Sequence, residues 1–167
     1  MVMRRFKVAQ VGVGARGQAT LAAFQKYGDS VDITAICDTD KTYLQEAATQ
    51  FHISACFSNV DDLIEHADFD VASVTTPTPV RQEVIQPFLE AGIHVLVDKP
   101  LAETLDHAKA IVACSEKNGR LVAVGQNFRY MSGFDSARRY LADRPLGTPR
   151  HLTHLLLGRR WDKGWRY

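Results

Sequence analysis

The amino-acid sequence predicts an α/β domain whose strands form a doubly wound parallel sheet. Three observations support this fold class. Short apolar runs alternate with longer amphipathic stretches along most of the 167 residues. The first apolar run leads into a Gly-x-Gly-x-x-Gly motif, and the second ends in an aspartate, Asp38. Helices that connect successive strands by right-handed crossovers place those strands in one parallel sheet.

The first apolar run, residues 6–11, is expected to be a strand that turns into a helix over residues 16–27. In the turn, Gly12 permits the sharp change of direction, Gly14 lets the backbone approach a pyrophosphate, and Gly17 lets the helix pack closely on the sheet. The amino end of this helix offers unpaired N–H groups to a phosphate. The motif therefore predicts a dinucleotide-binding turn, with a plain glycine turn as the alternative.

Asp38 follows the glycine motif at the interval expected of an acid that binds the adenosine ribose. It ends the strand expected over residues 31–37. A carboxylate there can accept hydrogen bonds from both ribose hydroxyls of NAD, and it repels the extra phosphate of NADP. No basic residue stands directly after it, so NAD is the predicted cofactor and NADP the less favoured one. The residues expected at the cofactor in this region are Gly12, Val13, Gly14, Ala15, Arg16, Gly17 and Asp38.

Further strands and helices alternate along the rest of the chain. The expected strands are residues 55–57, 70–74, 94–97 and 121–124, and one more is expected to begin within 147–157. Side chains that can accept a hydrogen bond from the first turn of a helix precede the helices between them. The expected N-caps are Asp40, Asn59, Thr78 and Thr104, and Ser132 begins a capping box.

Two helices carry more specific expectations. The helix after Thr78 contains Pro87, where a proline can kink or break the helix. The helix after Thr104 ends at Gly119. Its apolar residues recur at helical spacing and are expected to face the sheet; they are Leu105, Ala108, Ile111 and Val112.

In a doubly wound sheet the ligand lies beyond the carboxyl ends of the strands. The residues that directly follow each strand are therefore the candidates for chemistry. Besides the glycine motif and Asp38, they are Thr75, Thr76 and Pro77, then Asp98, Lys99 and Pro100, and then residues 126–129. For Thr75–Pro77 the alternative is a plain turn from strand to helix.

At these positions the sequence resembles the glucose–fructose oxidoreductase and inositol dehydrogenase (Gfo/Idh/MocA) family. The resemblance rests on the string AGIHVLVDKPLA at residues 91–102, on Thr76-Pro77, and on Gly125-x-Asn127-x-Arg129, together with the glycine motif. It implies an NAD(P)-dependent enzyme that moves a hydride to or from a sugar, a cyclitol or a related small polyol. It also implies a second, α+β domain after the Rossmann domain, and a homo-oligomer built by the full-length protein.

The resemblance assigns Lys99 the role of the catalytic, active-site lysine, against the alternative of a surface cation at a strand end. An ammonium beside a substrate hydroxyl can polarise it and stabilise a developing alkoxide. Asp98 stands where the family usually has glutamate, and it is expected to contact the nicotinamide-side ribose. The resemblance also places Asn127 at the site. Arg129 either lines the same site or forms a salt bridge at a helix start.

Two positions depart from the family pattern. Thr78 and Arg81 stand where the family commonly has asparagine and histidine. Arg81 is expected either to favour an anionic group on the substrate or to be solvated on its helix. For Arg16, inside the glycine motif, three environments stay open: contact with the adenine, an ion pair with a phosphate, and exposure to solvent.

Composition and charge exclude several classes of binding partner. The formal net charge is +1, so the chain has no electrostatic footprint for nucleic acid. No apolar run is long enough to cross a membrane. The three cysteines are widely spaced, which argues against a disulfide framework or a metal site and favours a reducing, cytoplasmic location. The small polyol or sugar that the family resemblance implies therefore remains the predicted partner, and no metal is expected.

The predicted domains are a dinucleotide-binding Rossmann domain over residues 1–145 and the start of a truncated substrate and oligomerisation domain over residues 146–167. On this reading the chain ends before the second domain that completes the active site, so the chain alone is expected to be inactive. The alternative is a standalone NAD-binding module or sensor without catalysis. The two hypotheses differ on whether a downstream domain supplies the remaining catalytic groups.

Overall fold

The computed structural model of the protein describes residues 4–142, 147–148, 150–151, 153 and 155. The chain separates into two compact units, Met1–Gln126 and Asn127–Tyr167, and each unit is described by itself. The division into domains at residue 145 stays a prediction. Among the described residues, no helix combines the length and the apolar character needed to cross a membrane.

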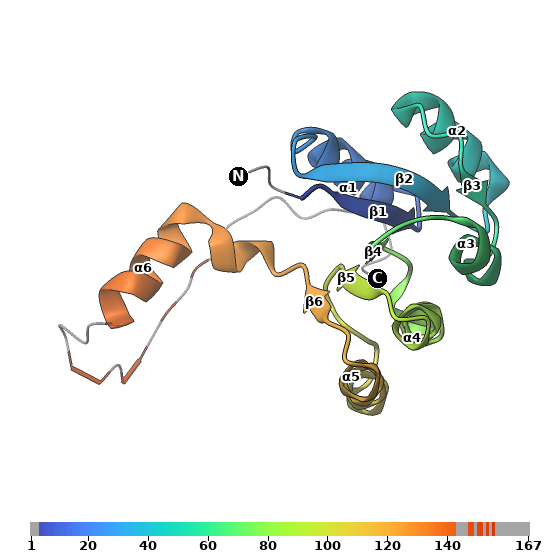
Figure 1. Ribbon diagram of the computed structural model, residues 1–167. Coiled ribbons are helices and arrows are strands. Elements are labelled where there is room, and N and C mark those ends of the chain that lie inside the picture. Colours follow the sequence, from blue (N-terminus) through green and yellow to red (C-terminus); the bar gives the residue numbers. More distant parts are fainter. Residues whose placement is uncertain (1–3, 143–146, 149, 152, 154, 156–167) are drawn as a thin grey trace. The chain divides into compact units, whose positions relative to one another are not determined.

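The first unit is built on a six-stranded parallel sheet with strand order β3-β2-β1-β4-β5-β6 (Figure 1). The strands are β1 (Phe6–Val11), β2 (Val31–Cys37), β3 (Cys56–Phe57), β4 (Val71–Val74), β5 (His94–Val97) and β6 (Val122–Val124). The order reverses between β1 and β4, because the chain crosses over the sheet after β3. This topology confirms the predicted doubly wound sheet, and in such sheets the ligand binds outside the carboxyl ends of the strands where the order reverses, here β1 and β4.

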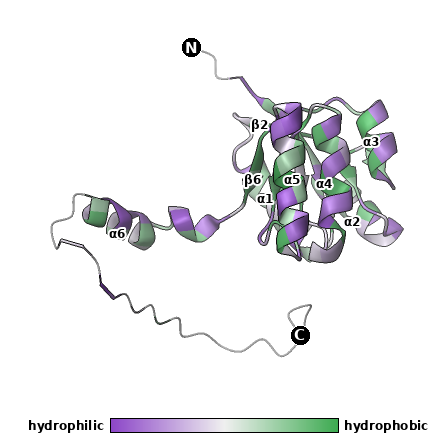
Figure 2. Ribbon diagram, turned by 90° about the horizontal axis from the view of Figure 1, so that it is seen from below, coloured by the Kyte–Doolittle hydropathy of each residue, from purple (hydrophilic) through white to green (hydrophobic). Residues whose placement is uncertain are grey.

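Helices cover both faces of this sheet. They are α1 (Ala15–Gln25), α2 (Lys41–Phe51), α3 (Val60–His66), α4 (Arg81–Glu90) and α5 (Leu105–Asn118). One buried cluster joins α1 and α2 to β2 through Leu21, Ala47 and Ile36. A larger cluster joins α3, α4 and α5 to the central strands through side chains such as Phe88 and Ile111. In Figure 2 these helices carry hydrophilic segments beside hydrophobic ones, as expected of helices with one face on a sheet.

The helix starts show which capping predictions hold. Asp40 accepts hydrogen bonds from Thr42 N at 2.8 Å, Asn59 from Asp62 N at 2.8 Å, and Thr104 from His107 N at 3.2 Å, so these three N-caps are confirmed. The prediction for Thr78 is wrong. A 3₁₀ turn, η1 (Thr78–Val80), precedes α4, its N-cap is Pro77, and no side chain caps it.

Two further helix predictions are corrected or refined. Helix α4 continues as one helix through Pro87. In α5, Ile111 is fully buried, but Leu105 is 69% exposed and Val112 is also exposed, so the prediction that both face the sheet is wrong. Their helical spacing is real, yet the buried stripe of α5 runs through Ile111 and Cys114 instead.

The second unit contains a 3₁₀ turn, η2 (Asn127–Tyr130), and the helix α6 (Ser132–Ala142), which begins at the predicted Ser132. Phe128 and Phe134 stack with ring centroids 5.9 Å apart. The strand expected within residues 147–157 includes residues outside the described ranges, so it stays a prediction.

Candidate dinucleotide-binding site

The glycine motif forms the turn between β1 and α1. Gly12 has a φ of +82°, which favours glycine. A Cβ on Gly17 would lie 1.9 Å from the carbonyl oxygen of Gly12, so this position admits no side chain. Gly14 differs, because a Cβ there would meet only the ring of Tyr43, at 3.9 Å. The turn is thus tightly closed at Gly12 and Gly17 and open at Gly14.

Gly14 is also the N-cap of α1, and no side chain caps the helix there. The first-turn N–H groups of α1 therefore have no side-chain acceptor of the kind that caps α2, α3 and α5. An uncapped helix amino end behind an open glycine is suited to an anionic phosphate, both by its unpaired donors and by the helix dipole. In the same turn, the Val13 side chain is buried in the core, whereas Ala15 is exposed.

Asp38 stands beside this turn, at the carboxyl end of β2. Its Oδ2 accepts a hydrogen bond from the backbone N–H of Val13 at 2.7 Å, and its Oδ1 accepts one from Asp40 N at 2.9 Å. Each carboxylate oxygen has a further lone pair with which to accept from a ligand hydroxyl. The predicted ribose-binding acid therefore lies against the glycine turn, and it also holds the backbone of that turn in place.

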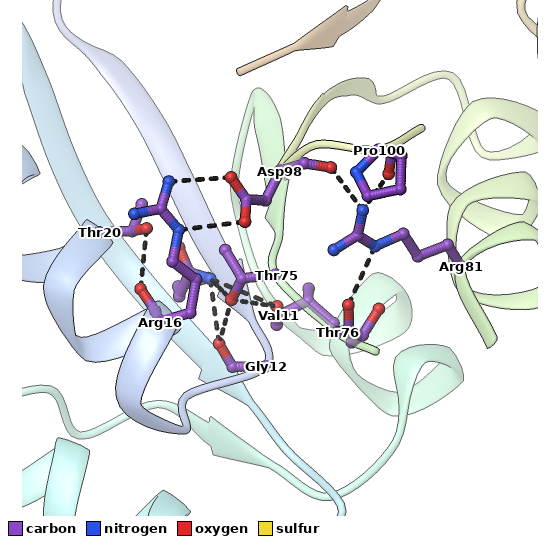
Figure 3. A network of polar contacts seen from close by, with 10 residues as sticks. Val11, Gly12, Arg16, Thr20, Thr75, Thr76, Arg81, Asp98 and Pro100 are labelled. Carbon is purple, nitrogen blue, oxygen red and sulfur yellow. Dashed lines mark hydrogen bonds and ion pairs between the residues drawn. The ribbon is translucent and has the colours of Figure 1, made fainter. Parts of the chain in front are cut away.

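Gln10, which the sequence analysis did not single out, ties the glycine turn to β4. It is fully buried in β1, and its Nε2 donates to Thr75 Oγ1 at 2.9 Å and to the Gly12 carbonyl at 3.1 Å. The Thr75 hydroxyl donates to the same Gly12 carbonyl at 2.7 Å, as Figure 3 shows. The signal that could have found Gln10 is an amide inside an apolar strand, because buried polar groups require hydrogen-bond partners.

Asp98, at the carboxyl end of β5, forms an ion pair with Arg16 of the glycine motif (Figure 3). The guanidinium spans the carboxylate, with Nη2 at 2.8 Å from Oδ1 and Nε at 3.1 Å from Oδ2. The Asp98 side chain is only 8% exposed and the Arg16 side chain 56%. The expectation of solvent exposure for Arg16 is therefore confirmed, and its ion pair with Asp98, which follows β5, is a contact that the sequence analysis did not predict.

Arg81 is the second arginine at this edge of the sheet, and it is buried, with only 4% of its surface exposed. Its Nε donates to the Thr76 carbonyl at 3.0 Å, and its Nη1 donates to the carbonyls of Asp98, at 2.6 Å, and Pro100 (Figure 3). The expectation of a solvated side chain is thus wrong. Burial lowers the pKa of the Arg81 guanidinium, and the nearby negative charge of Asp98 opposes that shift.

The remaining predicted residues are placed as follows. Lys99 is half-buried in the turn after β5, and its peptide bond to Pro100 is cis. Thr76 is half-buried, and its hydroxyl has no hydrogen-bond partner in the described part of the chain. Pro77 is exposed in the turn after β4. Asn127 is exposed and begins η2 of the second unit, so its contact with the site stays a prediction.

The contacts together join four strand ends. Asp38 links β2 to the glycine turn after β1, Gln10 links that turn to β4, and Arg16 links it to β5. The sheet order, the glycine turn after the first strand and the acid after the second define a dinucleotide-binding Rossmann domain.

The comparison with protein families agrees with this class. A family model described as the oxidoreductase family with an NAD-binding Rossmann fold, Gfo/Idh/MocA, matches residues 6–126. The chain belongs to this family and covers its NAD-binding domain.

Two of the curated relatives are named as dehydrogenases of a sugar and of a cyclitol. D-apiose dehydrogenase of Paraburkholderia graminis is 30% identical over 88% of this chain and 39% of its own length. Inositol 2-dehydrogenase of Ralstonia nicotianae is 29% identical over 86% of this chain and 43% of its own length. The chain therefore spans about two fifths of the length of these relatives.

Solved structures show the same fold. GenD2 from gentamicin A biosynthesis, solved in complex with NAD, is 28% identical with a TM-score of 0.77, covering 86% of this chain and 41% of that one. The WlbA dehydrogenase of Bordetella pertussis, solved with NADH and UDP-GlcNAcA, has a TM-score of 0.82 at 23% identity, covering 86% and 44%. The second likeness concerns the fold alone.

Proposed function

We propose that this chain is the NAD-binding half of a dehydrogenase that transfers a hydride to or from a sugar, a cyclitol or a related small polyol. The observation that carries the proposal is the turn after β1, which is open at Gly14 and flanked by the Asp38 carboxylate. The names of the curated relatives, D-apiose dehydrogenase and inositol 2-dehydrogenase, support the polyol class. Residues that choose among polyols, and the surface that assembles a homo-oligomer, belong in this proposal to a further domain.

In the proposed complex, the pyrophosphate lies over Gly14 and the uncapped amino end of α1, where backbone N–H groups can donate to it. The adenosine ribose lies against Asp38, whose charge disfavours a 2′-phosphate, so NAD is preferred to NADP. Thr75, Thr76 and Pro77 border the cofactor from the end of β4. Asp98 faces the nicotinamide-side ribose, and Asn127 stays a candidate cofactor-binding residue of the second unit.

Lys99 is the proposed catalytic residue. It is the second residue after β5, next to Asp98, so it stands at the same end of the sheet as the cofactor turn. Bound NAD supplies the hydride acceptor. The Lys99 ammonium would donate a hydrogen bond to the substrate hydroxyl oxygen and stabilise the negative charge that develops there, while the hydroxyl proton passes to water. We place this reaction in the cytoplasm.

The experiment is a calorimetric titration of the protein with NAD and NADP, in wild type and in two variants. Asp38→Asn keeps one acceptor oxygen for Val13 N but removes the charge. Because a hydrogen bond to a charged group is worth about 1.5–3 kcal/mol, we expect NAD to bind roughly 10-fold to 100-fold more weakly and the preference over NADP to shrink. Asp40→Ser is the matched control, since it removes an acid two residues away and keeps an N-cap.

Two outcomes would contradict the proposal. One is a folded wild-type protein that binds no NAD at millimolar concentration. The other is tighter binding of NADP than of NAD. An equal loss of NAD affinity in Asp40→Ser would show that general charge, and not contact with Asp38, governs binding.

A further inference from the structure

Arg81 donates hydrogen bonds to the backbone on both sides of Lys99. One nitrogen, Nη1, donates to the carbonyl before Lys99, that of Asp98, and to the carbonyl after it, that of Pro100. We propose that Arg81 is a positioning residue that holds the Asp98–Pro100 turn and thereby sets the place of Lys99 and Asp98 at the cofactor. This inference rests on the proposed function and concerns a position at which the sequence departs from its family.

The geometry of the guanidinium suits this task. Its planar fork has N–H groups in fixed directions, so it can donate to several fixed acceptors at once. Here Nε reaches the Thr76 carbonyl of the turn after β4, while Nη1 reaches the turn after β5. A single side chain therefore fastens the two neighbouring turns to each other. A lysine ammonium at the end of a flexible stem lacks this fixed geometry.

The burial of Arg81 indicates that these bonds matter. A buried charge costs free energy unless it is compensated by hydrogen bonds or an opposite charge. Arg81 is buried, and the described residues show it bonded to carbonyl groups and not to a carboxylate. An apolar residue would fill the same core position without that cost. The presence of an arginine there is therefore explained by the carbonyl groups that its guanidinium holds.

The turn after β4 is also held by hydrogen bonds that do not involve Arg81. Thr75 N donates to the Val11 carbonyl at 2.9 Å, and the Thr75 hydroxyl belongs to the Gln10 and Gly12 network. Without the Arg81 guanidinium, the turn after β5 keeps the bond from Asp98 N to the Val74 carbonyl, at 2.9 Å, and the Arg16 ion pair, but it loses both bonds from Nη1. We therefore expect the turn after β5 to shift more than the glycine turn, whose hydrogen bonds in the described part of the chain do not involve Arg81. In the proposed complex, only the nicotinamide half of the cofactor meets the turn after β5. The adenosine diphosphate half meets the glycine turn and Asp38.

This division gives a direct test with two ligands, NADH and ADP, titrated into the 167-residue protein. In Arg81→Met, which keeps the length of the side chain and removes its donors, we expect the affinity for NADH to fall about tenfold, as for one misaligned charged hydrogen bond. The affinity for ADP should stay within about twofold, because Gln10, Thr75 and Asp38 hold the glycine turn through bonds that do not involve Arg81. Arg81→Lys keeps the charge without the fork and should show the same pattern.

Arg120→Met is the matched control. Arg120 also donates to backbone carbonyls, those of Gly92 at 2.5 Å and Gly119 at 3.2 Å, but these turns precede β5 and β6 at the opposite edge of the sheet. We expect both affinities to be unchanged in this variant.

Each outcome decides a separate point. A selective loss of NADH affinity in both Arg81 variants supports the proposal. Unchanged NADH affinity, an equal loss for NADH and ADP, or full recovery in Arg81→Lys overturns it. Failure of the wild type to bind either ligand is a different result, because it overturns the proposed function and not the role of Arg81 within it.

Discussion

Replacing Gly17 with alanine should destabilise the fold, although alanine is the better helix former. The position lies inside α1, in the turn that approaches the end of β1. A Cβ there would be 1.9 Å from the Gly12 carbonyl oxygen and 3.1 Å from Thr75 Oγ1, while real Cβ contacts essentially never fall below 3.0 Å. The helix and the turn would therefore have to separate by more than 1 Å.

The size of the effect follows from three contributions. Alanine in place of glycine favours a helix by about 1 kcal/mol. Overpacking a tightly packed site costs about 1–3 kcal/mol. The Gly12 carbonyl also accepts from Gln10 and Thr75, and each of these hydrogen bonds is worth about 1 kcal/mol when the separation breaks it. We expect the free energy of unfolding to fall by about 3 kcal/mol.

Gly14→Ala is the informative partner of this variant, because both changes add one methyl group to the same turn. Its Cβ would lie in ordinary contact with Tyr43, and the backbone at Gly14 has a φ of −62° that alanine can adopt. The poorer N-cap and the more restricted unfolded chain roughly offset each other, each by about 0.5–1 kcal/mol. Stability should hardly change, but the methyl group would occupy the proposed place of the pyrophosphate.

The assay combines urea unfolding followed by circular dichroism with calorimetric titration of NAD. Gly17→Ala should lower the unfolding midpoint, whereas Gly14→Ala should keep it and lose about tenfold or more in NAD affinity. Wild-type stability in Gly17→Ala would refute the packing argument. Wild-type NAD affinity in Gly14→Ala would refute the placement of the pyrophosphate.

Two further predictions follow from titratable groups. Burial raises the pKa of the Cys37 thiol to about 12, so iodoacetamide at pH 8 should modify the exposed Cys56 and spare Cys37, as peptide mapping by mass spectrometry will show; equal rates would contradict this. Hydrogen bonds from Arg138 and Arg139 lower the pKa of Asp135 in α6. The resulting support for α6 is present above the carboxyl's unfolded pKa and is lost as pH falls through its folded pKa. The NMR helix shifts of α6 should weaken in acid, and Asp135→Asn should remove this dependence on pH.

Local signals in the sequence were sufficient for most of the fold. The caps at Asp40, Asn59 and Thr104 each act within three residues, so the pattern that predicts them is contained in a short window. The glycine turn is similar, because one strand, three glycines and one helix are contiguous. The parallel sheet then follows from the alternation of elements and the handedness of crossovers.

The parts that could not be predicted depend on contacts between distant segments. Arg81 meets Asp98 and Pro100 only because two strand ends lie side by side, and an arginine at the start of a helix does not reveal from the sequence that it is buried. The ion pair of Arg16 with Asp98 joins residues 82 apart in the chain. Leu105 shows the opposite case, in which an apolar residue at helical spacing stays exposed because the sheet lies on another side of α5.

The bond between Asp38 and Val13 N has a consequence for any attempt to redesign this domain for a different coenzyme. The Asp38 carboxylate, which is proposed to discriminate between NAD and NADP, also stabilises the glycine turn that must bind either dinucleotide. Exchanging Asp38 for a small or basic residue would make room for the 2′-phosphate of NADP. It would at the same time remove a hydrogen bond that holds the glycine turn in place. A successful redesign therefore has to provide a new acceptor for the Val13 amide along with the new charge.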